Sequence, residues 1–412
     1  MRLLHTSDWH LGQSLHHYDR SHEHQCFLDW LLDTLESEAI DALLIAGDIF
    51  DNANPSAQAQ RLFYRFLAAA KQRLPRLDIL LIAGNHDSPA RLEAPAPLFE
   101  SFDARAIGQV TRDAEGRIEL ERLLVPLRNR EREVAAWCLA VPFLRPGDLP
   151  RLETQGDAYL AGIERLYHQV LDLALERREP GQAILALGHC HLSGGTISAD
   201  SERRLIIGGA EALPVEIFDP AIAYTALGHL HRAQNIGGLE RVRYAGSPLP
   251  LSFAEVHYQH QVVRVDLDSE SLATTVPLPV PRWVDLLRVP KQHAPLDEVL
   301  DALLALELPE TPLIAQPYLE VRVRLEAPEP GLRARIESVL EGKPVRLARI
   351  DPTYGRQNPA TAAEGPQSLD DLGRLQPEDL FRKLHHGRHG AEPATRLLEA
   401  FRELWLHQED EA

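Results

Sequence analysis

The sequence predicts a mixed α/β fold, because short apolar runs alternate with segments that have the apolar spacing of helices. Several of these runs end in glycine followed by a polar residue, which is typical of a buried strand that enters a loop. In α/β proteins, functional residues gather outside the carboxyl ends of such strands. The strand-like runs that precede polar residues are 3–4, 43–45, 79–82, 184–185 and 226–227.

Three helices are predicted within residues 1–275, which we expect to form the first domain. Residues 26–36, 56–71 and 157–178 place apolar side chains three or four positions apart, the spacing of a helix that packs one face on a core. Residues 112–133 are rich in acidic and basic side chains instead. We therefore expect a solvated hairpin or insertion there.

A second domain is predicted over residues 281–350. Apolar and charged residues alternate along 318–325, which is the period of a half-buried strand. The other strands are expected at 284–289 and 345–350, and helices at 296–306 and 332–340. This order gives a small β-α-β-α-β module, in which we expect no catalytic residue.

The last part of the chain is expected to be a linker followed by a helical hairpin. Residues 351–367 are rich in Pro, Gly, Thr, Ala and Asn, a composition typical of linkers. Pro377 and Pro393 each suit the first turn of a helix. The resulting helix–loop–helix at 369–408 is too small to bury its apolar side chains alone, so we expect it to dock on another protein, with packing on the first domain of its own chain as the alternative.

Seven polar residues that follow the predicted strands form a candidate metal site. Carboxylate, amide and imidazole groups together suit Mn, Fe, Zn or Mg better than a thiolate-binding metal. Seven ligands are too many for one tetrahedral ion and suit two ions that share a bridging carboxylate, for which Asp48 is the natural choice. Two ions roughly 3.5–4 Å apart are a standard arrangement for phosphoester hydrolysis. The predicted ligands are Asp8, His10, Asp48, Asn85, His189, His229 and His231.

The motifs, in this order, resemble those of the calcineurin-like metallophosphoesterases. Residues 5–12 (His-Thr-Ser-Asp-Trp-His-Leu-Gly) and 47–51 (Gly-Asp-Ile-Phe-Asp), with the C-terminal hairpin, resemble more closely the family of nuclease D subunits of bacterial SbcCD complexes. The resemblance implies two mixed β-sheets sandwiched between helices. It also implies that 281–350 is a DNA capping domain and that 369–408 binds the coiled-coil base of an ATPase subunit.

The resemblance implies a role for each site residue. His86 matches the family's catalytic histidine, which protonates the leaving oxygen or stabilises the transition state. Asp87 would orient His86 or its loop, and Asp51 stands where some relatives carry a histidine. One ion would be held by Asp8, His10, Asp48 and His231, and the other by Asp48, Asn85, His189 and His229. Manganese is the expected metal, with magnesium as the alternative.

Other histidines have simpler interpretations. The family pattern requires only His189 of the segment 188–191, so His191 is expected to be a loop residue. A cluster of four other histidines is interpreted as part of a solvated loop before the first helix. The alternatives are a further metal site, or a loop that faces DNA or a dimer partner. Its members are His16, His17, His22 and His24.

The resemblance further implies a DNA nuclease that acts in repair, replication and recombination. It would be an exonuclease on double-stranded ends and an endonuclease on single strands and hairpins, controlled by the ATPase of an SbcC-type partner. A homodimer within a heterotetramer is expected, with Phe63, Tyr64 and residues 92–102 as candidate contacts. In the loop 244–250, Ser247 is a candidate phosphate contact, and a plain tight turn is the alternative.

Composition narrows the class of protein and its location. The 412 residues carry a net charge of −18, whereas DNA-binding domains usually have a basic footprint. We therefore expect a basic partner or a concentrated basic patch. The sequence contains no run of 18 apolar residues, so we expect no membrane span. The N-terminus also lacks the apolar core of a signal peptide. The three widely spaced cysteines favour a reducing, cytoplasmic location, where the protein would associate with the nucleoid.

Three other functions are alternatives to a nuclease. A protein phosphatase typically has an arginine directly after the position of Asp51, but Asn52 and Ala53 follow here. A small-molecule phosphodiesterase would need neither a cap nor an exposed helical hairpin. A non-catalytic scaffold for the ATPase would be indicated by lost ligands, and none of the seven is lost.

Overall fold

The computed structural model describes residues 1–100, 102–150, 157–198 and 212–354, together with residues 381, 382, 385, 393, 397 and 398. The chain divides into two compact units, Met1–Arg324 with Glu329–Thr353, and Leu325–Pro328 with Tyr354–Ala412. The predicted helix–loop–helix at 369–408 lies outside the described residues, apart from those six. Almost all of the described residues therefore belong to the first unit.

The first sheet has six strands and joins both ends of the first predicted domain. In spatial order its strands are β14 (Ser271–Pro279), β13 (Gln261–Asp268), β1 (Arg2–Thr6), β4 (Ala42–Ala46), β5 (Asp78–Ile82) and β6 (Ala104–Ile107). The run from β1 to β6 is parallel, and β13 is antiparallel to both β1 and β14. The N-terminal strand β1 is thus an interior strand of this sheet.

The second sheet also has six strands. In spatial order they are β11 (Gln234–Ile236), β12 (Leu239–Tyr244), β10 (Tyr224–Gly228), β9 (Ala183–His189), β8 (Val134–Ala140) and β7 (Leu124–Arg128). The four central strands are parallel, and the two edge strands are antiparallel to their neighbours. The prediction of a solvated insertion at 112–133 is therefore wrong in its second half, because β7 is a partly buried strand of this sheet.

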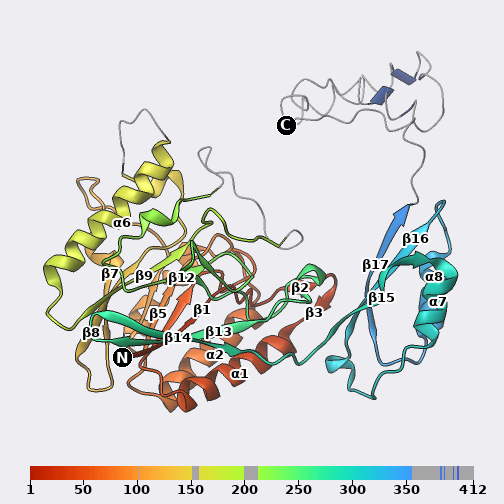
Figure 1. Cartoon of the computed structure of the whole chain (residues 1–412), viewed down its shortest axis with the longest axis horizontal. Helices are drawn as coiled ribbons and strands as arrows, with labels where there is room; N and C mark the ends of the chain where they lie inside the picture. Colours follow the sequence, from red (N-terminus) through yellow and green to blue (C-terminus); the bar gives the residue numbers. More distant parts are fainter. Residues whose placement is uncertain are drawn as a thin grey trace. The chain divides into compact units, whose positions relative to one another are not determined.

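Helices cover the outer faces of the two sheets, as expected for a mixed α/β fold (Figure 1). The helices α1 (Ser21–Ser37) and α2 (Ala57–Arg73) pack on the first sheet, and α6 (Ala158–Arg177) packs on the second. Leu44 of β4 points into the core between the sheets, whereas Leu43 points toward α1 and α2. Because alternate side chains enter two different cores, these strands are apolar throughout rather than alternating.

The three helices predicted in the first domain are confirmed, with one correction at α1. This helix begins at Ser21, so His22 and His24 lie in its first turn rather than in a solvated loop. His24 is fully buried, and burial lowers the pKa of its imidazole to about 3. The shorter elements of the first unit are β2 (Ser14–Leu15), β3 (Tyr18–Asp19), α3 (Pro89–Glu93), α4 (Ala96–Glu100), α5 (Leu120–Leu123), η1 (Pro146–Asp148), η2 (Val215–Ile217), η3 (Phe253–Glu255) and η4 (Leu313–Ala315).

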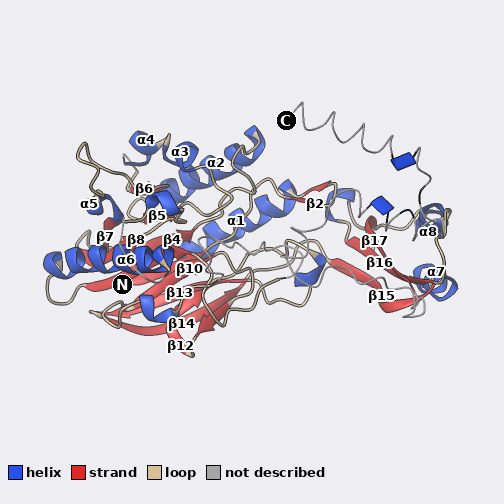
Figure 2. Cartoon of the chain, turned by 90° about the horizontal axis from the view of Figure 1, so that it is seen from above, coloured by secondary structure: helices blue, strands red, loops and turns tan. Residues whose placement is uncertain are grey.

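The predicted second domain has the expected order of elements (Figure 2). They are β15 (Leu286–Pro295), α7 (Leu296–Leu304), β16 (Tyr318–Leu325), α8 (Leu332–Leu340) and β17 (Arg346–Tyr354). The three strands form one sheet in the order β15-β16-β17, and α7 and α8 pack on each other. The strand β17 continues through residues 351–354, so the linker cannot begin at 351 as predicted.

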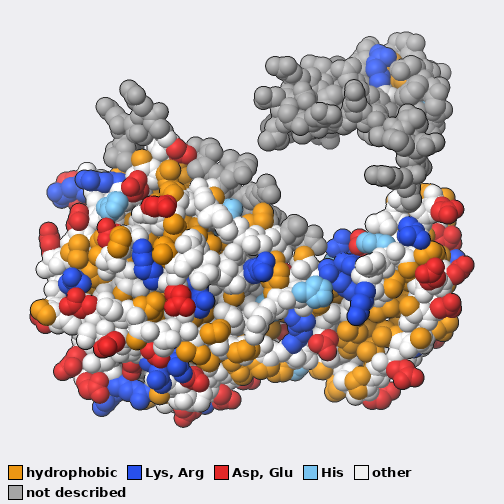
Figure 3. Space-filling model, in the orientation of Figure 1, with side chains coloured by type: hydrophobic (Ala, Val, Ile, Leu, Met, Phe, Trp, Pro, Cys, Tyr) orange, Lys and Arg blue, Asp and Glu red, His pale blue; other side chains and the backbone are white. Residues whose placement is uncertain are grey.

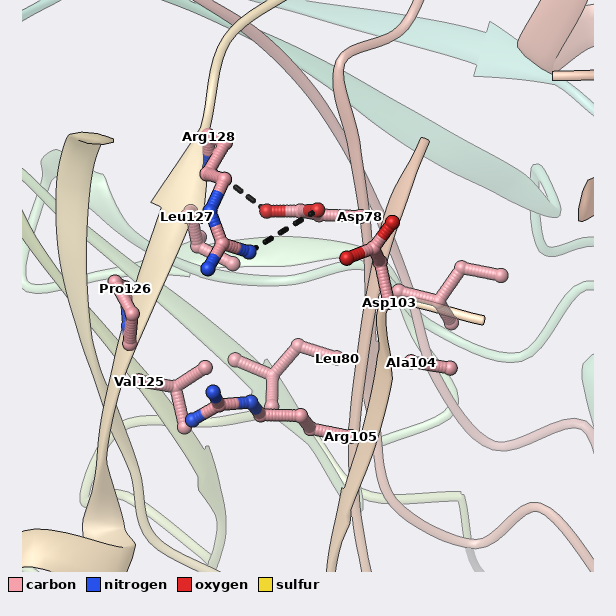
Figure 4. Close-up of a pocket in the computed structure, with 10 residues that line it drawn as sticks. Asp78, Leu80, Asp103, Ala104, Arg105, Val125, Pro126, Leu127 and Arg128 are labelled. Atoms are coloured by element: carbon pink, nitrogen blue, oxygen red, sulfur yellow. Dashed lines mark hydrogen bonds and ion pairs between the residues drawn. The ribbon is translucent and has the colours of Figure 1, made fainter. Parts of the chain in front are cut away.

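The two large sheets are also joined by ion pairs where β5 begins (Figure 4). The Asp78 carboxylate accepts a hydrogen bond from the backbone N–H of Arg128 at 2.8 Å and lies 3.9 Å from its guanidinium. A cavity of about 180 Å³ lies beside this contact. It is at the opposite end of β5 from Asn85, and so is distinct from the predicted metal site. Among the described helices, none combines the length and the apolar character that a bilayer span needs.

Candidate metal centre

The predicted ligands meet because the parallel strands of both sheets end at one edge. Asp8 and Asp48 follow β1 and β4, which are neighbours in the first sheet. His189 ends β9 and His229 follows β10, and these strands are neighbours in the second sheet. Strand direction and sheet packing therefore bring together residues that are 221 positions apart, since the Asp8 carboxylate accepts the backbone N–H of His229 at 2.9 Å.

Four of the seven predicted ligands have left-handed backbone conformations. The φ angles are 55° at Asp8, 45° at His10, 48° at Asp48 and 104° at His229. Such conformations cost non-glycine residues roughly 1–2 kcal/mol each and persist where the surroundings enforce them. Here the N–H of Asp8 donates to the carbonyl of Gly47, and that of His10 donates to the carbonyl of Asp48, both at 3.0 Å. The strain is therefore stored where the predicted ligands lie.

Glycines permit the close approach of the loops. A Cβ atom on Gly84 would lie 2.1 Å from Oδ1 of Asp48, and one on Gly228 would lie 2.0 Å from the carbonyl oxygen of Ala46. Both distances are far below van der Waals contact. The Gly-Asn-His-Asp and Gly-His-x-His motifs thus need their glycines for packing around Asp48.

Asp48 is the centre of the cluster. Its Oδ2 lies 3.3 Å from Nε2 of His189 and 3.7 Å from Nε2 of His10. The side-chain oxygen of Asn85 lies 3.0 Å from ring nitrogens of both His189 and His229. Asp48 therefore lies beside members of both predicted ligand sets, which is the position that a bridging carboxylate requires.

The remaining predicted ligands complete this arrangement. Donor atoms of Asp8, His10 and His231 lie within 4.8 Å of one another, and the same holds for Asp8, Asp48 and His189. Nε2 of His10 is buried and makes no hydrogen bond to any described atom. A buried polar atom without a partner is costly, and coordination to a cation would satisfy it. The donor set and this unsatisfied nitrogen both fit divalent metal ions.

Electrostatics in the cluster are strongly coupled. Burial alone raises the pKa of Asp48, but the neighbouring His189 outweighs it and holds that pKa well below its usual range. Burial lowers the pKa of His189, but the charge of Asp48 and its hydrogen bond raise it to about 9. Burial and then His189 hold the pKa of His229 well below its usual value. The buried carboxylates thus demand positive charge nearby, which metal cations supply in such sites.

His86 lies at the edge of this cluster and is only half-buried. Its backbone N–H donates to Oδ1 of Asp48 at 2.8 Å, and its Nδ1 donates to the backbone carbonyl of Asp51 at 2.7 Å. Donor atoms of His86, His10 and Asp48 are also close enough to share a metal ion, so geometry alone allows a ligand role. The bond to Asp51 leaves Nε2 as the ring atom available to a substrate.

Three carboxylates orient the site, and the roles of two of them, Asp51 and Glu255, were not predicted from sequence. The side chain of Asp51 lies 3.3 Å from Nδ1 of His10, and Glu255 lies 2.8 Å from Nδ1 of His231. Such carboxylates orient metal-binding histidines in many proteins. Asp51 was visible in its motif, whereas Glu255 belongs to no motif. Asp87 accepts the backbone N–H groups of Ile49, Phe50 and Gly84, so of its two expected roles the structure shows the ordering of the loop.

Two further expectations concern residues beside the cluster. Ser247 is fully buried and its hydroxyl lies 3.4 Å from Nδ1 of His260, so a direct contact between this side chain and phosphate is not supported. The ring of His191 lies 6.3 Å from that of His229 and is only partly buried, in agreement with a loop residue.

Comparisons with known proteins match most of this chain. A family model described as calcineurin-like phosphoesterase matches residues 1–233, and one described as type 5 capsule protein repressor C-terminal domain matches 282–386. The D subunit of the nuclease SbcCD from Rhodobacter capsulatus is 42% identical over 386 residues, which cover 92% of this chain and 93% of that protein. The proteins of the same name from Escherichia coli K12 and Bacillus subtilis are 33% and 31% identical and cover 93% and 100% of this chain, and 92% and 99% of their own lengths.

The close approach of Gly84 to Asp48 generates a stability prediction. Gly84→Ala should lower the free energy of unfolding by about 1–3 kcal/mol, because a methyl group cannot fit beside the carboxylate without moving it. Gly147→Ala is the matched control, since a Cβ atom at position 147 would have no other atom within 4 Å. Urea unfolding of both variants is the measurement, and equal stability of the two would contradict the packing argument.

Proposed function

The chain belongs to the family of SbcCD nuclease D subunits, with a calcineurin-like phosphoesterase domain, and we propose that it hydrolyses phosphodiester bonds in DNA with two divalent metal ions. It is a metal-dependent phosphodiesterase of the nuclease type. The observation that carries the finer proposal is the convergence of the seven predicted donors in one cluster that includes Asp48.

The proposed ligands divide into two sets that share Asp48. The first ion would bind Asp8, His10, Asp48 and His231, and the second would bind Asp48, Asn85, His189 and His229. Mixed oxygen and nitrogen donors suit manganese, our proposed metal, and magnesium is the alternative. Bound ions of this kind lower the pKa of a water molecule and neutralise charge on the phosphoryl oxygens.

The chain's own residues would orient the reaction around the ions. We assign His86 as the catalytic residue that protonates the leaving oxygen or stabilises the transition state. Its support is geometric, because the Asp51 carbonyl holds Nδ1 and leaves Nε2 free for the substrate. The backbone hydrogen bond from His86 to Asp48 fixes the histidine beside the proposed bridging group.

We propose DNA as the substrate, cleaved as an exonuclease at double-stranded ends and as an endonuclease on single strands and hairpins. Acidic and basic side chains are intermixed over the face drawn in Figure 3, in keeping with the net charge of −18. The proposed capping module nevertheless gathers Arg288, Arg322 and Arg349 around Glu320, with Asp351 beside Arg349. Three guanidinium groups beside two carboxylates give this one cluster a local basic excess, which we propose as a contact for DNA.

We propose two partners, a second copy of this chain and a coiled-coil ATPase of the SbcC type. The relatives are named as one subunit of the nuclease SbcCD, which supports a multisubunit complex. Together they would form a heterotetramer that acts in the cytoplasm at the nucleoid, in DNA repair, replication and recombination.

An apolar cavity of about 400 Å³ supports the proposed dimer. Tyr64 of α2 contributes to its lining, together with Leu98 and Phe102, whose exposed fractions are 65% and 51%. Phe63 is fully buried in the core under α2, so its predicted role as a dimer contact is wrong. Residues 92–102 therefore remain the better candidates, apart from the buried Leu92 and Phe99.

Two substitutions separate chemistry from metal binding. His86→Ala should reduce the rate on a single-stranded oligonucleotide by about 10²–10⁴-fold, because a general acid contributes this much. It should leave Mn²⁺ binding, measured by calorimetry, close to that of the wild type. Asp48→Ala should lose both the rate and the bound ions, since it removes the shared ligand.

The calorimetric comparison decides the role of His86. If His86→Ala loses Mn²⁺ as completely as Asp48→Ala does, then His86 is a ligand and the assignment is wrong. One bound ion per wild-type chain would contradict the two-ion proposal.

The dimer surface can be tested by one substitution. Leu98→Glu should halve the molar mass measured by light scattering, because it places a charge in the apolar cavity. Leu175→Glu is the control, since Leu175 of α6 is also an exposed leucine, at 40%, but lies away from this cavity. An unchanged mass for Leu98→Glu would remove support for this surface.

The tail can be tested by deletion. Removing residues 369–412 should abolish co-purification with the ATPase, because the helix–loop–helix is the proposed docking element. Mn²⁺ binding should stay unchanged, since all seven proposed ligands lie before residue 232. Full retention of the ATPase by the shortened chain would refute the proposed role of the tail.

A further inference from the structure

The single-turn helix η3 contacts both the metal cluster and the module of β15–β17. Phe253, its first residue, is buried in an apolar cluster with Leu286 of β15 and Tyr318 of β16. Glu255, its last residue, is fully buried and lies 2.8 Å from Nδ1 of His231. One short turn thus connects packing on the module with the orientation of a proposed ligand.

A buried polar network begins at Tyr318 of β16. The hydroxyl of Tyr318 donates to Glu23 of α1 at 2.9 Å, and the ring of Tyr318 lies 3.9 Å from the guanidinium carbon of Arg346. Glu23 is held by two hydrogen bonds from Arg20, at 2.6 and 3.0 Å, and both residues are buried. Position 318 is therefore linked directly to a buried ion pair of the catalytic domain.

The network continues from this ion pair to Glu255. Arg20 donates to the carbonyl of Pro250 at 2.7 Å and to the side chain of Gln13 at 2.8 Å. Gln13 in turn donates to the carbonyl of Leu251 at 3.0 Å. The backbone N–H of Leu251 donates to the second oxygen of Glu255 at 2.7 Å. A continuous set of contacts therefore runs from Tyr318 to Glu255, whose other oxygen faces His231.

Because these contacts are buried, each of them contributes more free energy than it would in water. Hydrogen bonds and ion pairs are stronger inside a protein than in water, and removing one partner leaves the other unsatisfied. A shift of the module that moved Tyr318 would therefore disturb Arg20, the backbone at 250–251 and Glu255 together.

We propose that Glu255 is a positioning residue for His231, and that the module of β15–β17 sets its placement through η3 and Arg20. A carboxylate can only accept, so Nδ1 of His231 keeps its proton and Nε2 keeps the lone pair that a metal needs. The inference rests on the metal site proposed above, because it takes His231 as a ligand. It adds that the metal affinity depends on the contacts of the module with η3 and with the Arg20–Glu23 ion pair.

Substitutions of Glu255 test the positioning role. Glu255→Leu should weaken Mn²⁺ binding by about 10–100-fold, as loss of such carboxylates does elsewhere. Glu255→Gln keeps one acceptor oxygen, so its affinity should lie between those of Glu255→Leu and the wild type. Nitrogen-15 NMR of the histidine rings, recorded without metal, should show that His231 carries its proton on Nδ1 in the wild type and loses this preference in Glu255→Leu.

Tyr318→Phe tests the connection with the module. It should weaken Mn²⁺ binding by about two- to tenfold, the size of coupling usual between groups in one network. Tyr159→Phe is the matched control, because the Tyr159 hydroxyl also makes one hydrogen bond, 2.8 Å to the carbonyl of Leu144. Tyr159 belongs to α6, which contributes no residue to this network. Calorimetry with Mn²⁺ alone is the measurement for both variants.

The outcomes separate this inference from the proposed function. Unchanged Mn²⁺ affinity and an unchanged His231 tautomer in Glu255→Leu would overturn the positioning role. Equal affinities for Tyr318→Phe and Tyr159→Phe would overturn the connection with the module. Retained Mn²⁺ binding in Asp48→Ala would instead overturn the metal site itself, and the metal-free NMR comparison does not depend on that result.

Discussion

The buried carboxylate of Asp48 is the constraint around which the rest of the site is built. A carboxylate taken out of water without compensation costs several kcal/mol. Its surroundings meet this demand with the N–H of His86 and the imidazoles of His10 and His189. Donors from both sheets are needed, so the two sheets must stack with their parallel strands ending at the same edge. The left-handed turns and the glycines are consequences of that crowding.

Much of this arrangement could be predicted from sequence, because the signals are local. A strand with both faces covered is apolar along its whole length, as β4 is, and a ligand placed after it appears as Gly-Asp. Helix α2 has the stripe of apolar residues that its packing requires, and Ser56, where the predicted helix begins, is its N-cap. Strand β16 has the predicted bounds, and its burial alternates from Val321 to Leu325, but residues 318–321 are all buried. In each case, one segment carries the information.

The failures share a different physical cause, which is that the deciding partner is distant in the sequence. His24 was expected in solvent, but Arg20 and Glu23 beside it are buried because Tyr318 closes over them, 295 residues after Glu23. Glu255 has no motif, since only the folded chain shows that it faces His231. The charged residues of 112–133 concealed β7, whose place is set by pairing with β8. Phe63 was expected at a surface, but Trp9 and Phe50 pack against its ring.

The position of β1 inside the first sheet has a consequence for synthesis of the protein. One edge of β1 pairs with β4, which leaves the ribosome early, but the other edge pairs with β13, in which Arg264 lies opposite Leu4. At roughly 5–20 residues per second, the second edge waits on the order of tens of seconds for its partner. During that interval an apolar strand has an open edge, which is a template for pairing with other chains. The nascent chain is therefore open to pairing with other chains at this edge until residue 268 has emerged.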